Sequence, residues 1–93
     1  MTFITFVVTA YCACALCTGH THGITKSGRP ATVNRTIACP PHMMHKVVWL
    51  DGIGARVCED TGSKIKGKRI DLYVQTHDEA LKFGKKIVKV RVY

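Results

Sequence analysis

Acidic residues are scarce in this sequence. The 93 residues include 6 Asp and Glu against 14 Lys and Arg, which gives a formal net charge of +8. This excess of positive charge favours an anionic partner, whether a cell-wall polymer, a nucleic acid or a lipid surface, and its sign does not choose among them. The basic residues are dispersed along the chain, which is typical of a solvated surface.

Long hydrophobic runs are also missing. No segment approaches the ~20 apolar residues that are needed to span a bilayer, so we expect no transmembrane segment. Residues 1–11 begin without positive charge and carry threonines through their apolar stretch, which makes a poor signal peptide and fits a first strand. The sequence contains no internal repeat and no low-complexity segment. Its length is that of one small domain, residues 1–93.

Short apolar runs separated by turn residues predict a mostly β structure. After the first strand, the runs lie at 36–39, 46–50, 53–60, 70–74 and 87–93. Asp51-Gly52 is a hairpin signal between the second and third of these runs. The pattern predicts a small β-barrel, with Trp49 packed in the core or at the barrel mouth.

One helix is expected from about residue 77 to residue 83. Thr76 is its predicted N-cap, Glu79 completes a capping box, and Gly84 ends it. The helix should pack on the barrel through Ala80, Leu81 and Phe83.

Five cysteines raise the question of a metal site. An eleven-residue segment holds thiol and imidazole side chains that Zn²⁺ accepts as ligands, although their spacing is not that of a standard zinc finger. The candidate zinc ligands are Cys12, Cys14, Cys17, His20 and His22. A disulfide or free buried thiols are the alternatives.

Cys39 and Cys58 lie in two predicted strands and could pair if the barrel brings these strands together. An odd number of cysteines leaves at least one thiol unpaired in a monomer. Cys39 as a nucleophile activated by His42 or His45 is conceivable from residue type alone, but no spacing rule supports it.

Two carboxylates flank a basic loop bounded by glycines. Asp60 follows the apolar alternation of residues 53–57, and Asp71 starts the next apolar run, so each should lie at the end or start of a strand. Gly62 and Gly67 let the loop between them fold back and bring the carboxylates near each other. The pair suggests acid/base chemistry on a polar substrate, although two ordinary exposed acids on a hairpin fit the same pattern.

The motifs around this loop resemble the three-aspartate (3D) domain family, which includes the catalytic barrel of membrane-bound lytic transglycosylase A. In chain order, these motifs are Asp60-Thr61-Gly62, Ile65-Lys66-Gly67, the segment of residues 69–73 and the segment of residues 77–81. Residues 8–11, the Cys12-x-Cys14-x-x-Cys17 cluster and residues 23–28 resemble the N-terminal half of phage-type members. The resemblance covers nearly the whole chain and implies a six-stranded double-psi β-barrel.

The resemblance also implies a lytic transglycosylase that cleaves the MurNAc-GlcNAc β-1,4 bond with formation of an anhydro sugar. Asp71 matches the catalytic acid/base, and Asp60 would raise its pKa or orient it. Cys39 stands where the family's first aspartate is expected, and the missing charge predicts a lower pKa for Asp71. The predicted substrate-binding residues are Tyr11, Thr25, Ser27, Thr61 and Lys66, the last for an anionic group of the substrate.

Two other functions fit the sequence. One is a noncatalytic barrel that binds wall polymer or a protein partner, for example within a phage particle. The other is a metal- or thiol-dependent protein that uses the cluster at residues 12–22. On the leading interpretation, the chain is a monomer that binds peptidoglycan glycan strands, binds no nucleic acid specifically and needs no cofactor. It acts at the cell wall or in the periplasm if exported, and otherwise stays in the cytoplasm until release.

Overall fold

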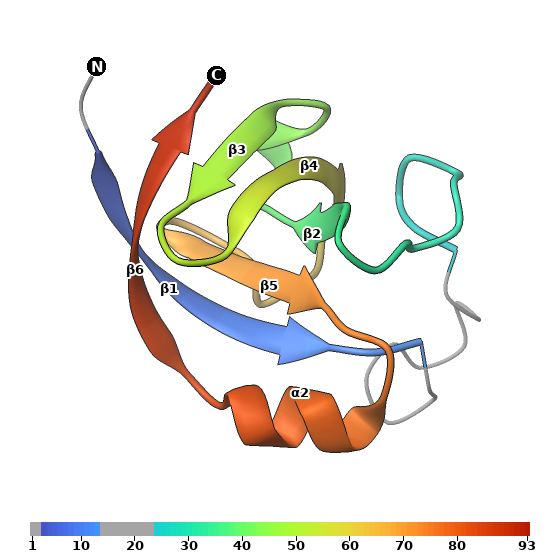
Figure 1. Ribbon diagram of the computed structural model, residues 1–93. Helices are drawn as coiled ribbons and strands as arrows, with labels where there is room; N and C mark the ends of the chain where they lie inside the picture. Colours follow the sequence, from blue (N-terminus) through green and yellow to red (C-terminus); the bar gives the residue numbers. More distant parts are fainter. Residues whose placement is uncertain (1–2, 14–23) are drawn as a thin grey trace.

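A computed structural model describes residues 3–13 and 24–93 of the chain (Figure 1). Six strands pair into a closed barrel in the order β1-β5-β2-β4-β3-β6. The strands are β1 (Ile4–Tyr11), β2 (Thr36–Ala38), β3 (Val47–Leu50), β4 (Gly54–Asp60), β5 (Arg69–Tyr73) and β6 (Lys86–Val92). The 3-10 turn η1 (Pro41–Met43) follows β2, and the helix α2 (His77–Phe83) precedes β6. Over the residues that the structure describes, the prediction of a mainly β, six-stranded barrel with one short helix is confirmed.

Two of the strand pairs in the barrel are parallel, namely β1 with β5 and β2 with β4. The other neighbours run antiparallel. Parallel neighbours need a long crossover connection, so strands that lie side by side are distant in sequence. As a result, the short strand β2 lies between β4 and β5 (Figure 1).

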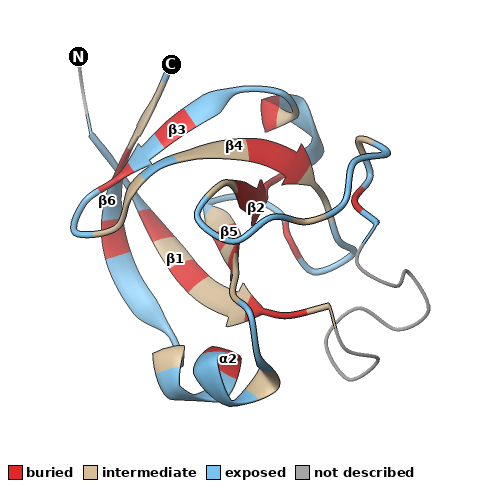
Figure 2. Ribbon diagram, turned by 45° about the vertical axis from the view of Figure 1, so that its right-hand side comes forward, coloured by how far each residue is buried: buried red, intermediate tan, exposed pale blue. Residues whose placement is uncertain are grey.

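Side-chain alternation separates the barrel interior from its outer face. On β1, Phe6 and Val8 are buried in the core, whereas Val7 and Thr9 between and after them are only half-buried (Figure 2). On β5, Ile70 and Leu72 point inward. Because strand side chains alternate, the residues between them point outward. The polar residues Thr9 and Asp71 therefore share the outer face.

The outer face also carries Trp49, which is 40% exposed. The prediction that Trp49 packs in the core or at the barrel mouth is wrong. Its strand neighbours Val48 and Leu50 are fully buried, and the alternation of β3 therefore directs Trp49 outward.

Helix α2 begins and ends where the sequence predicts. The Thr76 hydroxyl accepts a hydrogen bond from the Glu79 N–H at 3.1 Å, and Gly84 ends the helix with a φ of 66°. Ala80 is buried and Phe83 packs against the core, but Leu81 is 66% exposed. The predicted packing of Leu81 is therefore wrong. Residues three apart share one face of a short helix, and Leu81 lies outside the face that Ala80 and Phe83 share.

Within residues 3–13 and 24–93, no helix has the length and apolar character needed to cross a membrane.

Candidate functional site

Asp60 and Asp71 lie in one row across the outer face of the barrel. Ala38 of β2 pairs with Asp71 of β5 on one side and with Asp60 of β4 on the other. Neighbouring strands lie about 4.8 Å apart, so the backbones of the two aspartates are about 10 Å apart. The fold thus brings together the two carboxylates that the sequence singled out.

A β-bulge in β4 sets the direction of Asp60. Ile37 pairs with Cys58, but Ala38 pairs with Asp60, so Glu59 is an extra residue in β4. Without the extra residue, Asp60 would point the same way as Cys58, whose side chain lies in the core. The bulge therefore turns Asp60 to the outer face, where Asp71 lies.

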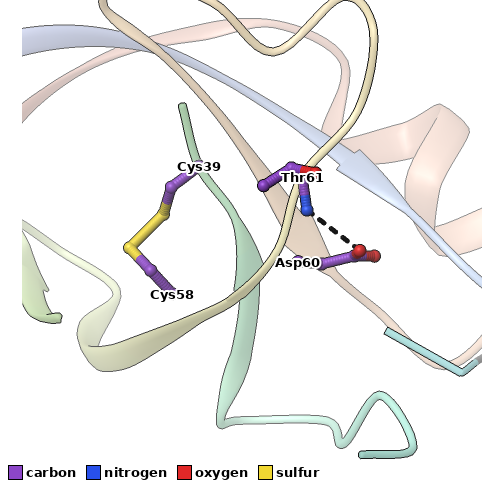
Figure 3. Close-up of a disulfide and its surroundings, with 4 residues drawn as sticks. All are labelled: Cys39, Cys58, Asp60 and Thr61. Atoms are coloured by element: carbon purple, nitrogen blue, oxygen red, sulfur yellow. Dashed lines mark hydrogen bonds between the residues drawn. A yellow bond between two sulfur atoms is a disulfide. The ribbon is translucent and has the colours of Figure 1, made fainter. Parts of the chain in front are cut away.

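Three donors hold the carboxylate of Asp60. The Tyr11 hydroxyl donates to Oδ2 at 3.2 Å, and the backbone N–H of Lys26 donates to Oδ1 at 2.9 Å. The backbone N–H of Thr61 also donates to Oδ1 at 2.9 Å (Figure 3). An ionised carboxylate only accepts hydrogen bonds, and these donors match that requirement. The three donors therefore hold the Asp60 carboxylate in one orientation.

Asp71 has different surroundings. Burial raises the pKa of Asp71 above its ordinary value of 3.8, and the charge of Asp60 acts in the same direction. The hydroxyl of Thr9, which donates to Asp71 Oδ1 at 3.0 Å, and the charge of Arg69 lower this pKa in part. The pKa of Asp71 is thus raised although Cys39 provides no charge. Two carboxylates in unlike surroundings can divide the roles of proton donor and fixed charge.

Two tyrosines lie beside the aspartates. Tyr11 and Tyr73 face each other on β1 and β5, and their ring centroids are 5.4 Å apart in an edge-to-face arrangement. Burial, with the nearby charges of Asp60 and Asp71, raises the pKa of Tyr11 well above 10.0, so its hydroxyl stays protonated and donates to Asp60. Ile65, from the loop after β4, covers the tyrosines with an apolar side chain.

The other predicted substrate-binding residues lie on the loop of residues 25–29 and on the loop between β4 and β5. Thr25 is 5% exposed, and its hydroxyl lies 2.7 Å from that of Ser27 and donates to the carbonyl of Arg29 at 2.8 Å. Thr25 and Ser27 thus hold the loop of residues 25–29 in shape beside the site. Thr61 is bound to Asp60 through its backbone, and Lys66 is exposed on the loop between β4 and β5.

Thr9 and Tyr73 were not predicted as site residues, although both contact the predicted site. A signal for each was present. Thr9 lies two residues before Tyr11, and Tyr73 lies two residues after Asp71, so strand alternation places each on the face of a predicted site residue. The pairing of β1 with β5, which joins the two sets, follows from the barrel and not from the local pattern.

Cys39 and Cys58 form a disulfide inside the barrel, with Cα atoms 5.7 Å apart (Figure 3). The expectation that the barrel could bring these cysteines together is confirmed. Both are fully buried in the core, so the side chain at position 39 points away from the Asp60 carboxylate. The alternative of Cys39 as a nucleophile beside His42 or His45 is wrong, because its sulfur is bonded to Cys58.

Most of the predicted zinc site, Cys14, Cys17, His20 and His22, lies outside the described residues. Its remaining member, Cys12, is 2% exposed at the end of β1. Among the residues that the structure does describe, no group of three or more His, Cys, Asp or Glu side chains is placed to hold a metal ion.

The chain is thus a closed β-barrel with two aspartates in one row on its outer face. Comparison with known proteins identifies its family. The sequence model of the 3D domain family matches residues 24–93. The chain belongs to this family, as its motifs predicted. It is 35% identical over 88 residues to YabE of Bacillus subtilis (strain 168), whose name calls it a cell wall shaping protein. It is 33% identical over 94 residues to YocH, a cell wall-binding protein of the same organism.

The two alignments cover 90% and 96% of this chain but 21% and 32% of these relatives. The chain therefore spans between a fifth and a third of the length of the curated relatives it matches.

Proposed function

We propose that this chain acts on the peptidoglycan of the bacterial cell wall and cleaves its glycan strands at the MurNAc-GlcNAc β-1,4 bond. The observation that carries the proposal is the unequal pair of carboxylates. Asp71 is half-buried with a raised pKa, and Asp60 is fixed by three donors in the same row. Family membership and the names of the two relatives support the wall as the place of action.

Asp71 acts in this scheme first as an acid and then as a base. Its protonated carboxyl group donates a proton to the glycosidic oxygen as the bond from C1 of the MurNAc residue breaks. The C6 hydroxyl of the same sugar attacks C1 and gives its proton to the Asp71 carboxylate. The product is a 1,6-anhydro sugar, no water is consumed, and the acid is restored for the next cycle.

Asp60 supports this cycle without exchanging a proton. Its negative charge helps to keep Asp71 protonated, because that charge raises the pKa of Asp71. Through Tyr11 and the backbone of Lys26, Asp60 also fixes β1 and the loop of residues 25–29 around the site. Asp60 is thus a positioning residue, and Asp71 is the group that meets the substrate.

A wall-binding barrel without cleavage is the second candidate. The name of YocH favours it. So does the direction of the Cys39 side chain, because only two carboxylates of the expected three-aspartate set face the site. Both candidates predict binding to the wall, and only the first needs the proton of Asp71.

The substitution Asp71→Asn separates the two candidates. Purified peptidoglycan is incubated with the unmodified chain, with Asp71→Asn, and with Asp78→Asn as a control that removes an exposed carboxylate from α2. Mass spectrometry of the released products and sedimentation with the wall are the measurements. We expect anhydro-muropeptides from the first and third proteins, and at least about 100-fold less from Asp71→Asn, with sedimentation kept in all three.

Sedimentation without products from any of the three proteins would favour the binding function. Loss of sedimentation by the unmodified chain would contradict both candidates.

A further inference from the structure

A cluster of charged groups lies beside the site, around the bulge residue Glu59. The Glu59 side chain is 3% exposed. Its Oε1 accepts hydrogen bonds from Nε of Arg35 at 2.9 Å and from the hydroxyl of Thr36 at 3.1 Å, and its Oε2 lies 3.4 Å from Nε of Arg29. The buried carboxylate is therefore paired with two guanidinium groups, as a buried charge requires.

Both arginines contact Glu59 through Nε. A guanidinium group carries five N–H donors, so four remain on each arginine at its Nη atoms. The side chains of Arg29 and Arg35 are 60% and 42% exposed, and these remaining donors can meet a ligand. Two positive charges share one negative charge, which leaves the cluster with a net positive charge. Glu59 thus holds two guanidinium groups in place without neutralising both.

The loop of residues 25–29 connects this cluster to the aspartates. The N–H of Lys26 donates to Asp60, and Arg29 follows three residues later, within about 10 Å of chain. The N–H of Ser27 donates to the carbonyl of Glu59 at 3.0 Å and fixes the loop on the bulge. One extended ligand can therefore lie across Asp60 and the arginines together.

We propose that Arg29 and Arg35 form a subsite for an oxyanion of the wall polymer. The oxyanion is a carboxylate of the peptide stem or a phosphate of an attached polymer. This inference rests on the proposed function, since it names the substrate group that the same site recognises. A guanidinium fork matches both oxyanions with two parallel hydrogen bonds. Because Glu59 holds the arginines in advance, less side-chain freedom is lost on binding.

The test compares three kinds of soluble peptidoglycan fragment. The first has free carboxylates and no phosphate, the second has amidated carboxylates and no phosphate, and the third has amidated carboxylates and retained phosphate. The variant carries Arg29→Gln, Arg35→Gln and Glu59→Gln, so that no unpaired charge is buried. Lys82→Gln, on the exposed face of α2, is the control with the same net charge.

We expect the unmodified chain and Lys82→Gln to bind at least one anionic fragment at least about tenfold more tightly than the neutral fragment. The triple variant should bind all three alike. The anionic fragment that the unmodified chain prefers shows whether the oxyanion is a carboxylate or a phosphate. Equal affinity of the unmodified chain for all three fragments would overturn the subsite, and so would a triple variant that keeps the preference or loses affinity for all three equally.

Cleavage that depends on Asp71 is measured on the same fragments. If that cleavage persists while all fragments bind alike, the subsite fails and the proposed function stands.

Discussion

Asp60 and Asp71 carry the same functional group, and their neighbours give them different properties. Asp60 is surrounded by donors from three segments of the chain, whereas the one donor found for Asp71 among the described residues is the hydroxyl of Thr9. Burial then decides the pKa of Asp71, because it outweighs that hydrogen bond. In the proposed function, Asp71 is therefore the group that supplies the proton for glycan cleavage.

The substitution Thr9→Val removes the hydrogen bond to Asp71 and keeps the shape of the side chain. Because this bond lowers the pKa of Asp71, its loss raises that pKa further. The alkaline limb of the pH profile of cleavage, which reports the acid, should move to higher pH. Muropeptide release over a pH series is the measurement. Thr5→Val, an exposed change on the same face of β1, is the control, and an equal shift in both variants would contradict the assignment.

Asp71 also links stability to pH. Since its folded pKa lies above the ordinary 3.8, its contribution to stability is fully present below that value and is lost as the pH rises through the folded pKa. Asp71→Asn does not titrate at this position. The variant should therefore gain stability relative to the unmodified chain as the pH rises. Urea unfolding of both proteins from about pH 3 to about pH 8 measures the effect, and a difference that stays constant over this range would refute it.

Among the structural elements, β4 carries a disulfide and a bulge at neighbouring residues, and the two have different roles. Cys58 precedes the bulge and ties β4 to Cys39 in the core, while Asp60 follows the bulge and faces the outer side. Glu59 between them anchors the loop of residues 25–29. The disulfide therefore stabilises the strands that carry the site without entering it.

Removal of the disulfide should destabilise the barrel by about 3 kcal/mol, as expected for a loop of this length. The two cysteines are 19 residues apart in sequence. Urea unfolding with and without a reducing agent is the measurement, and complete reduction is checked by mass spectrometry. The double variant Cys39→Ala/Cys58→Ala is the control, because the agent should not change its stability through this bond. An unmodified chain that is equally stable before and after reduction would contradict the prediction.

The local sequence pattern predicted the strands and the helix, but it did not predict which strands pair or in which register. The alternation of apolar residues located the strands, and Thr76 and Gly84 bounded the helix, because these signals depend on near neighbours. The motifs located Asp60 and Asp71. Other features depend on which strands pair, and this pairing is set by the closed barrel. They are the bulge at Glu59, the hydrogen bond from Lys26 to Asp60, and the contacts of Glu59 with Arg29 and Arg35.

At the scale of the whole molecule, the net charge of +8 gives the protein a long-range attraction to anionic polymers. Binding to wall that keeps its carboxylates and phosphates should therefore weaken several-fold between about 0.05 M and about 0.5 M salt, because salt shortens the range of charge interactions. Sedimentation with purified wall at these salt concentrations is the measurement. Amidated, phosphate-free wall is the control and should show little change. Equal salt dependence for both walls would contradict a contribution from the charge.

In the proposed function, Asp71 supplies the proton for glycan-strand cleavage. The most direct measurement is mass spectrometry of purified peptidoglycan after incubation with the unmodified chain and with Asp71→Asn, with both proteins shown to be folded and to sediment with the wall. We predict 1,6-anhydro-muropeptides from the unmodified chain and at least about 100-fold less from the variant. Equal yields of anhydro products from the two proteins would contradict the claim.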